Sequence, residues 1–349
     1  DINKAKRVHH TGICMKIVGT VSLIAALVFT FTSSYADEIR PGVYRTPEAR
    51  FENLSGFDYA PNYQYIDGYR IHYLDEGPVN GPVVLLLHGE PSWSYLYRKM
   101  IPVFVNAGYR TIVPDLLGFG KSDKPASRSD YSHSGQVSLI DQLVNELDLN
   151  NVSTFFQDWG GLIGLRVVAQ NPDRFAKIAI GNTGFPRGDG EDGIIIGTQF
   201  NTPNSDARLQ PGSNFLQWLR YSQEVPELSA SFVVQWGTGN DLSPEELDDY
   251  DAPFPDSRYK AGARVMPTLV QSQVATNREA WKVFENWQKP FLTTFSDSDS
   301  ITSGGEQQFQ NEVPGAADQR HTIIQDAGHF LQEDKGEELA NYLVNWFQD

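Results

Sequence analysis

The sequence predicts an α/β fold with a mostly parallel central sheet flanked by helices and a helical cap. Two observations support this prediction. Short apolar runs alternate with helical patterns along most of the chain, which is typical of a buried parallel sheet. Between about 186 and 288 the strand-like runs stop. We expect that stretch to cover the carboxyl edge of the sheet, where open α/β sheets bind their ligands.

The predicted elements follow from these runs in chain order. An antiparallel pair, 63–66 and 69–73, surrounds the tight turn Asp67-Gly68. Further strands are expected at 83–87, 111–113, 152–156, 177–180, 291–295 and 322–324. Helical patterns lie near 95–106, 134–147, 162–170 and 337–347. In the cap, Ser243 followed by Pro244 predicts a helix start. A polar lead-in runs from 37 to about 63.

Length and composition set the broad class. With 349 residues, of which 40% are hydrophobic, the chain can build a substantial core. The formal charge of -16 and the lack of a Lys/Arg run argue against binding to nucleic acid, which normally needs a basic face. We divide the folded part into a first core segment (37–185), a helical cap (186–288) and a second core segment (289–349).

The N-terminal residues resemble a secretory signal. Met15-Lys16 is followed by an apolar stretch of 15 residues (17–31) and by small residues ending at Ala36. This predicts a signal peptide over 15–36, a periplasmic or secreted protein, and no stable membrane association after cleavage. An uncleaved anchor is the alternative, although the stretch is short for a span of ~20 residues. Residues 1–14 would be translated upstream sequence or residues added by cloning.

Cysteine use excludes two classes of protein. The only cysteine, Cys14, lies before the predicted signal peptide. The mature chain would therefore have neither a disulfide framework nor a thiol nucleophile.

The first chemical motif is the segment from Phe156 to Gly161, which leaves a predicted strand and enters a predicted helix. In α/β hydrolases such a strand–turn–helix elbow usually carries the serine of G-x-S-x-G. No G-x-S-x-G occurs in this chain, and Asp158 stands at the apex. A helix N-terminus stabilises negative charge, so Asp158 is a candidate nucleophile. The alternative is that Asp158 only caps the helix.

Two further motifs follow predicted strands. His88-Gly89-Glu90-Pro91 comes after 83–87, where this fold supplies a backbone N–H to the oxyanion hole. The expected donors are the backbone N–H groups of Glu90 and Trp159, with His88 itself structural. After the last strand, Asp326 to Phe330 contains His329, a candidate base.

The acid that would orient His329 has two candidates. Asp297 and Asp299 both follow the 291–295 strand, and we favour Asp299 because it lies further into the loop. The other place for such an acid, after 177–180, has Asn182 and no carboxylate. The chain order is then nucleophile, acid, base, as in this fold.

With these motifs, the chain resembles the haloalkane dehalogenases, especially the subfamily typified by the bacterial 1,2-dichloroethane dehalogenase. The similar stretches cover most of 60–349. They are HGEPSWSYLYRKMIPVF from His88, DLLGFGKSDKP from Asp115, FQDWGG from Phe156, DAPFPDSRYKAG from Asp251 and DAGHF from Asp326.

The resemblance implies hydrolysis of a small haloalkane to alcohol, halide ion and proton. Asp158 would be the nucleophile, His329 the base and Asp299 the acid, with neither metal nor organic cofactor. Trp159 and a cap tryptophan would bind the halide; Trp218 is the best match and Trp236 the alternative. Monomers are common in this family. One departure is Ser300, where relatives often have Pro, and it weakens the choice of Asp299 over Asp297.

Two other functions compete with this interpretation. Epoxide hydrolases use the same Asp–His–Asp logic but need cap tyrosines, and Tyr221, Tyr250 and Tyr259 lie in the insert. Glu90 and Trp218 favour the dehalogenase. A non-catalytic binding protein of the same fold is the other class, and the complete set of Asp158, Asp299 and His329 opposes it.

Overall fold

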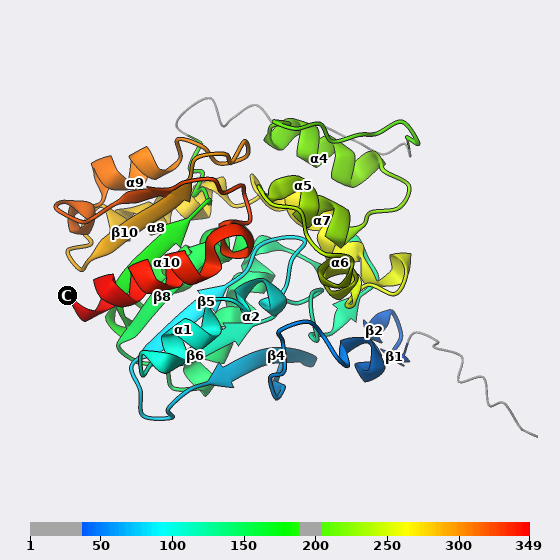
Figure 1. Cartoon of the computed structure of the whole chain (residues 1–349), viewed down its shortest axis with the longest axis horizontal. Coiled ribbons are helices and arrows are strands. Elements are labelled where there is room, and N and C mark those ends of the chain that lie inside the picture. The colour runs from blue at the N-terminus through cyan, green and yellow to red at the C-terminus, as the bar shows by residue number, and fades with distance from the viewer. Residues whose placement is uncertain (1–36, 189–203) are drawn as a thin grey trace, which may run out of the picture. The chain divides into compact units, whose positions relative to one another are not determined.

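A computed structural model describes residues 37–188 and 204–349 (Figure 1). The predicted signal peptide and the residues before it lie outside the described residues, so both stay predictions. Within the described ranges, no helix is long and apolar enough to span a bilayer.

The central sheet has eight strands in the order β11-β10-β9-β8-β5-β6-β4-β3. In this order, the neighbouring strands β11, β10, β9, β8, β5 and β6 pair in parallel. β4 pairs antiparallel with both β3 and β6. The strands are β3 (Asn62–Ile66), β4 (Tyr69–Glu76), β5 (Val83–Leu87), β6 (Arg110–Pro114), β8 (Val152–Gln157), β9 (Phe175–Gly181), β10 (Phe291–Ser296) and β11 (Thr322–Ile324). All eight predicted strands are confirmed, and the mostly parallel sheet with them.

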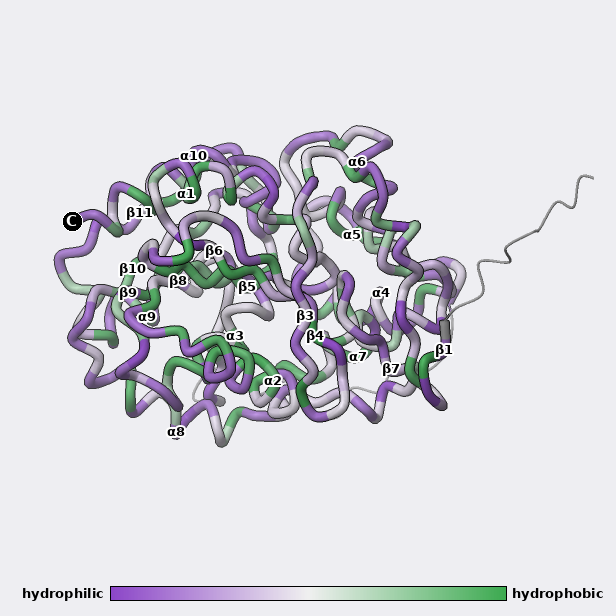
Figure 2. Tube along the Cα trace, turned by 90° about the horizontal axis from the view of Figure 1, so that it is seen from below, coloured by the Kyte–Doolittle hydropathy of each residue, from purple (hydrophilic) through white to green (hydrophobic). Residues whose placement is uncertain are grey.

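Helices cover both faces of this sheet (Figure 2). α1 (Ile101–Asn106) and α10 (Leu331–Gln348) lie on one face, and α2 (His133–Glu146), α3 (Trp159–Gln170) and α8 (Val274–Phe284) on the other. α9 (Glu306–Glu312) packs beside β10. Because β5 and β8 are covered on both sides, their apolar residues are almost fully buried and form the centre of the core. Short 3-10 helices lie in the connections, at η1 (Glu48–Phe51), η2 (Ser94–Tyr97), η3 (Arg128–Asp130), η4 (Pro172–Arg174), η6 (Ser257–Tyr259) and η7 (Pro314–Ala316).

Two local predictions need correction. The helix expected over 95–106 is a 3-10 helix at Ser94–Tyr97 followed by the shorter α1. Pro102 explains the break, since proline fits the first turn of a helix but not its interior. The polar lead-in contains two strands, β1 (Asp37–Arg40) and β2 (Val43–Arg45), which join β7 (Lys124–Pro125) in a small second sheet. Strands this short show no alternation in sequence.

The described part of the insert is helical. It comprises α4 (Phe215–Glu224), α5 (Ala230–Gly237), α6 (Pro244–Asp251) and α7 (Ala261–Leu269), which gather beyond one end of the sheet (Figure 1). Ser243 caps α6 through a capping box with Glu246, as its sequence predicts. α8 instead packs against α3, where Asn277 Oδ1 accepts a hydrogen bond from Arg166 at 3.2 Å. The predicted cap range, 186–288, therefore includes α8, a helix that packs with α3 on the central sheet and not with the cap.

The sharp turn into α3 depends on glycine. A Cβ on Gly160 would lie 2.1 Å from the carbonyl oxygen of Leu87, a backbone atom of the central strand β5. We expect Gly160→Ala to lower the free energy of unfolding by about 1–3 kcal/mol, the usual cost of overpacking. Thermal unfolding followed by circular dichroism measures this. Gly184→Ala is the control, because a Cβ there meets no atom within 4 Å; equal Tm losses in both variants would contradict the packing argument.

Candidate active site

Asp158 connects β8 to α3 in a rare backbone conformation, with φ 51° and ψ −125°. The turn is held by the Asp158 N–H, which donates to Asn182 O at 3.0 Å, and by Thr183 Oγ1, which donates to Asp158 O at 2.7 Å. The Asp158 side chain makes no capping hydrogen bond to α3. The helix-cap alternative is therefore wrong, and the carboxylate is directed over the carboxyl edge of the sheet.

The loop after β5 lies against this carboxylate. The Glu90 N–H donates to Asp158 Oδ1 at 2.8 Å. A Cβ on Gly89 would lie 2.3 Å from Asp158 atoms, so only glycine permits this approach. Trp159 begins α3, and its backbone N–H belongs to the first helical turn, where N–H groups lack intrahelical partners. Of the two N–H groups that the sequence predicted as donors, that of Glu90 contacts the carboxylate directly, and that of Trp159 directly follows Asp158 in the chain.

The side chains of Glu90 and His88 behave differently. Burial raises the pKa of Glu90 well above its usual value, and the charge of Asp158 raises it further, so both effects favour the protonated form of this side chain. Its Oε1 is buried and has no hydrogen-bond partner within the described ranges. Among the residues that the structure describes, His88 bonds to backbone groups alone, with Nε2 accepting from Leu116 N at 3.0 Å and Nδ1 lying 2.9 Å from Gly89 O. Its structural role is as predicted.

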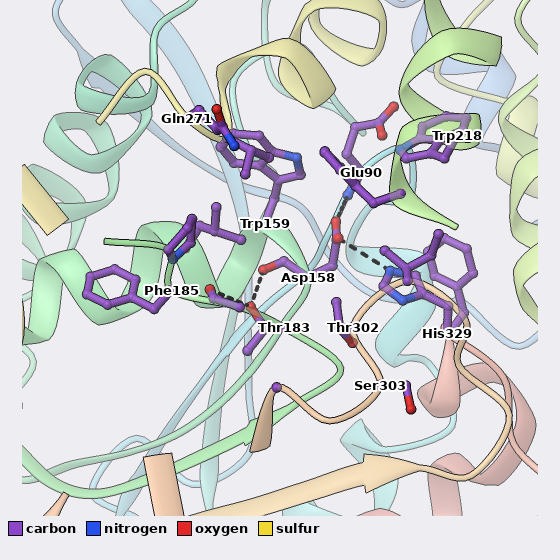
Figure 3. A pocket seen from close by; sticks show the side chains of 18 of the residues that line it. Glu90, Asp158, Trp159, Thr183, Phe185, Trp218, Gln271, Thr302, Ser303 and His329 are labelled. Atoms are coloured by element: carbon purple, nitrogen blue, oxygen red, sulfur yellow. Dashed lines mark hydrogen bonds and ion pairs between the residues drawn. The ribbon is translucent and has the colours of Figure 1, made fainter. Parts of the chain in front are cut away.

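His329 lies between two carboxylates. Its Nε2 is 3.3 Å from Asp158 Oδ2 (Figure 3), and its Nδ1 is 3.1 Å from Asp299 Oδ1. Burial by itself would lower the pKa of His329, but attraction to Asp299 and hydrogen bonds with both carboxylates raise it to about 10. Burial by itself would raise the pKa of Asp299. The positive charge of His329 and the hydrogen bonds from Thr302 and Ile301 outweigh the effect of burial, so the pKa of Asp299 lies below its usual value. The imidazole is therefore a cation while Asp158 is ionised.

The structure separates the two candidate acids. Asp299 is 4% exposed and contacts the imidazole. The Asp297 carboxylate points to the neighbouring loop, where it accepts the N–H groups of Asp326 at 3.1 Å and Ala327 at 3.2 Å. Asp297 thus supports the turn before His329 and does not touch the ring.

Two residues that the sequence reasoning did not assign also hold His329. Gln157 Nε2 donates to His329 O at 3.1 Å and lies 3.2 Å from His329 Nε2. Asn182 Nδ2 donates to the carbonyl oxygens of Gly328 and His329, both at 3.0 Å. Each stands at the end of a parallel strand, which is the only signal in the sequence that could have identified them.

A mostly apolar cavity of about 420 Å³ opens above Asp158. Trp159, Trp218 and Trp236 all line it. Trp236 Nε1 donates to Gln210 O at 2.9 Å, so its N–H is already used. Within the described ranges, the indole N–H groups of Trp159 and Trp218 have no protein acceptor. These two are the donors that a bound anion could use (Figure 3).

The three cap tyrosines lie away from this cavity. None of Tyr221, Tyr250 and Tyr259 is among the described residues that line it. Tyr250 donates its hydroxyl to Glu333 at 2.5 Å in a buried network, and Tyr259 packs on Tyr44. In the described ranges, no cluster of three or more His, Cys, Asp or Glu side chains could hold a metal ion.

The fold and the elbow define an enzyme of the α/β hydrolase class, and the family model for the alpha/beta hydrolase fold matches residues 82–336. A haloalkane dehalogenase from Psychrobacter cryohalolentis is 48% identical over 88% of the chain and 98% of the relative. One from Mycolicibacterium paratuberculosis is 41% identical over 88% and 98%. The solved structure of haloalkane dehalogenase DpaA from Paraglaciecola agarilytica, described as tetrameric, matches with a TM-score of 0.73 at 32% identity, covering 86% of this chain and 97% of that one.

This chain therefore belongs to the haloalkane dehalogenase family and is a hydrolase.

The contacts of His329 predict how its pKa responds to substitution. Asp158→Ala removes one negative charge and one hydrogen bond, so the pKa of His329 should fall from about 10. An NMR titration of the His329 ring protons measures this. Glu338→Gln, which removes a charge from an exposed position of α10, should leave the value unchanged. An unaltered pKa in Asp158→Ala would contradict the assigned contact.

Proposed function

We propose that the chain dehalogenates haloalkanes through an alkyl ester on Asp158, which water activated by His329 then hydrolyses. The observation that carries the proposal is the line Asp158–His329–Asp299 at the base of an apolar cavity with two available indole N–H groups. An aliphatic substrate fits this lining, and no polar group of the substrate is needed for the chemistry.

In the first step an Asp158 oxygen attacks the halogenated carbon, and the halide leaves with the bonding electrons. A carboxylate in an apolar cavity is a competent nucleophile because water no longer shields it. The halide gains charge as it departs, and Trp159 and Trp218 donate to it. Indole N–H groups are donors only, so this pair attracts an anion without offering it an acceptor.

In the second step water attacks the carbonyl carbon of the ester, and His329 takes its proton. Alkylation removes the charge of Asp158, and with it part of the attraction that raises the pKa of His329 to about 10. At this lower pKa the imidazolium releases its proton to solvent near neutral pH, and the neutral imidazole is the base that accepts the proton of water. Asp299 stabilises the cation that forms, while the N–H groups of Glu90 and Trp159 stabilise the oxyanion. Collapse releases the alcohol and restores the Asp158 carboxylate.

Epoxide hydrolysis by the same residues lacks support. Epoxide hydrolases use cap tyrosines to protonate the opening ring, and Tyr221, Tyr250 and Tyr259 lie outside the described lining of the cavity. The monomer expected from the resemblance stays a prediction, as does the periplasmic or secreted location; DpaA, a related protein, is described as tetrameric.

Two substitutions test the mechanism. Asp158→Ala should abolish bromide release from 1,2-dibromoethane, because no carboxylate remains to form the ester. His329→Gln should form the ester and fail to hydrolyse it, so the peptide that contains Asp158 should gain mass. Normal turnover by the Ala variant would refute the covalent route. Diol formation from styrene oxide at a higher rate than bromide release would instead support the epoxide hydrolase.

The choice of halide donor has its own test. Trp218→Phe should weaken bromide inhibition by at least about tenfold, since a hydrogen bond to a charged group contributes about 1.5–3 kcal/mol. Trp236→Phe is the matched control, because its N–H is bound to Gln210 O. Inhibition constants for bromide in both variants measure the difference. A larger loss in Trp236→Phe would transfer the role to that residue.

A further inference from the structure

The cap touches the loop that carries His329 through direct backbone contact. The Phe330 N–H donates to Gly237 O, at the end of α5, at 3.1 Å. A Cβ on Gly328 would lie 2.4 Å from that same oxygen, and a Cβ on Gly237 would lie 2.7 Å from the Phe330 ring. A glycine on each side therefore permits an approach that side chains would prevent.

Asp334, in the first turn of α10, bonds to the loop that carries His329 and to the cap loop that follows α5. Its Oδ2 accepts the N–H groups of Gly239 at 2.7 Å and Gly328 at 2.8 Å. Its Oδ1 accepts the backbone N–H of Asn240 at 3.0 Å and the Asn240 side-chain amide at 2.9 Å. One carboxylate thus joins two backbone N–H groups and one side-chain amide of the cap to the Gly328 N–H beside His329. Bonds to an ionised acceptor are the stronger kind.

The two sides of the His329 loop are held by different parts of the molecule. Its carbonyl oxygens accept from Asn182 and Gln157, which extend from the sheet. Its N–H groups at Gly328 and Phe330 bond to Asp334 and to Gly237 O. Loss of Asp334 leaves the Gly328 N–H without its acceptor, so that of these two bonds only the one from the Phe330 N–H to Gly237 O still holds the loop on the cap side.

We propose that Asp334 is a positioning residue for ester hydrolysis, because it holds the His329 loop against the cap and keeps the imidazole over Asp158. This rests on the proposed function, in which His329 acts only on water. Ester formation uses Asp158, Trp159 and Trp218, so it does not depend on the hydrogen bonds that Asp334 makes. The proposal therefore separates the two chemical steps.

The test measures both steps with 1,2-dibromoethane in rapid-quench experiments on Asp334→Ala and Asp334→Asn. Ester formation should keep its rate. Ester hydrolysis should slow by about tenfold or more, since a displacement of about 1 Å at a catalytic group can cost on the order of 100-fold. The mass increase on the Asp158 peptide should then appear during steady-state turnover. Asp334→Asn retains one acceptor oxygen and should lose less than Asp334→Ala.

Glu338→Gln is the control, because it removes one charge from an exposed position of the same helix. It should leave both steps unchanged. Hydrolysis at the wild-type rate in both Asp334 variants would overturn the proposal, as would equal slowing of both steps together with a lower Tm. If His329→Gln forms no ester, the proposed function itself fails. If His329→Gln traps the ester but both Asp334 variants hydrolyse it at the wild-type rate, only the positioning role of Asp334 is refuted.

Discussion

The backbone turn at Asp158 is the constraint on which the site depends. A non-glycine residue in such a conformation costs about 1–3 kcal/mol, and the bonds with Asn182 and Thr183 together with the close packing of Gly160 hold it in place. Because the side chain does not cap α3, its two oxygens are left for Glu90 N–H and His329.

The charges close to Asp158 influence which of the neighbouring side chains are protonated. Asp158, Asp299 and Glu90 are three acids close to a single base, His329. Burial and the charge of Asp158 raise the pKa of Glu90 and so favour its neutral form, and the two carboxylates that contact the imidazole are those of Asp158 and Asp299. Alkylation of Asp158 would remove one of these charges and leave the imidazolium paired with Asp299. The contact with Asp158 thus helps to keep His329 protonated in the free enzyme, and the loss of that charge on alkylation would lower the pKa of His329 so that it can act as a base.

The cap is joined to both loops that orient the base. Ser300, the departure that weakened the choice of Asp299, donates its hydroxyl to Ser213 O at 2.7 Å, just before α4 and its Trp218. On the other side, Phe330 bonds to Gly237 at the end of α5. The described residues, 37–188 and 204–349, belong to one compact unit. The cap is therefore part of the frame of the site as well as its cover.

The sequence by itself determined the sheet, the elbow at Asp158, the Glu90 loop and the His329 loop, because apolar runs and strand-end motifs are local patterns. Only the tertiary structure decided that Asp299 and not Asp297 contacts His329, and that Trp236 spends its N–H on Gln210 whereas Trp218 does not. It alone brought Asn182, Gln157 and Asp334 to the His329 loop. These outcomes depend on distances between segments far apart in the chain, and no local pattern encodes such distances.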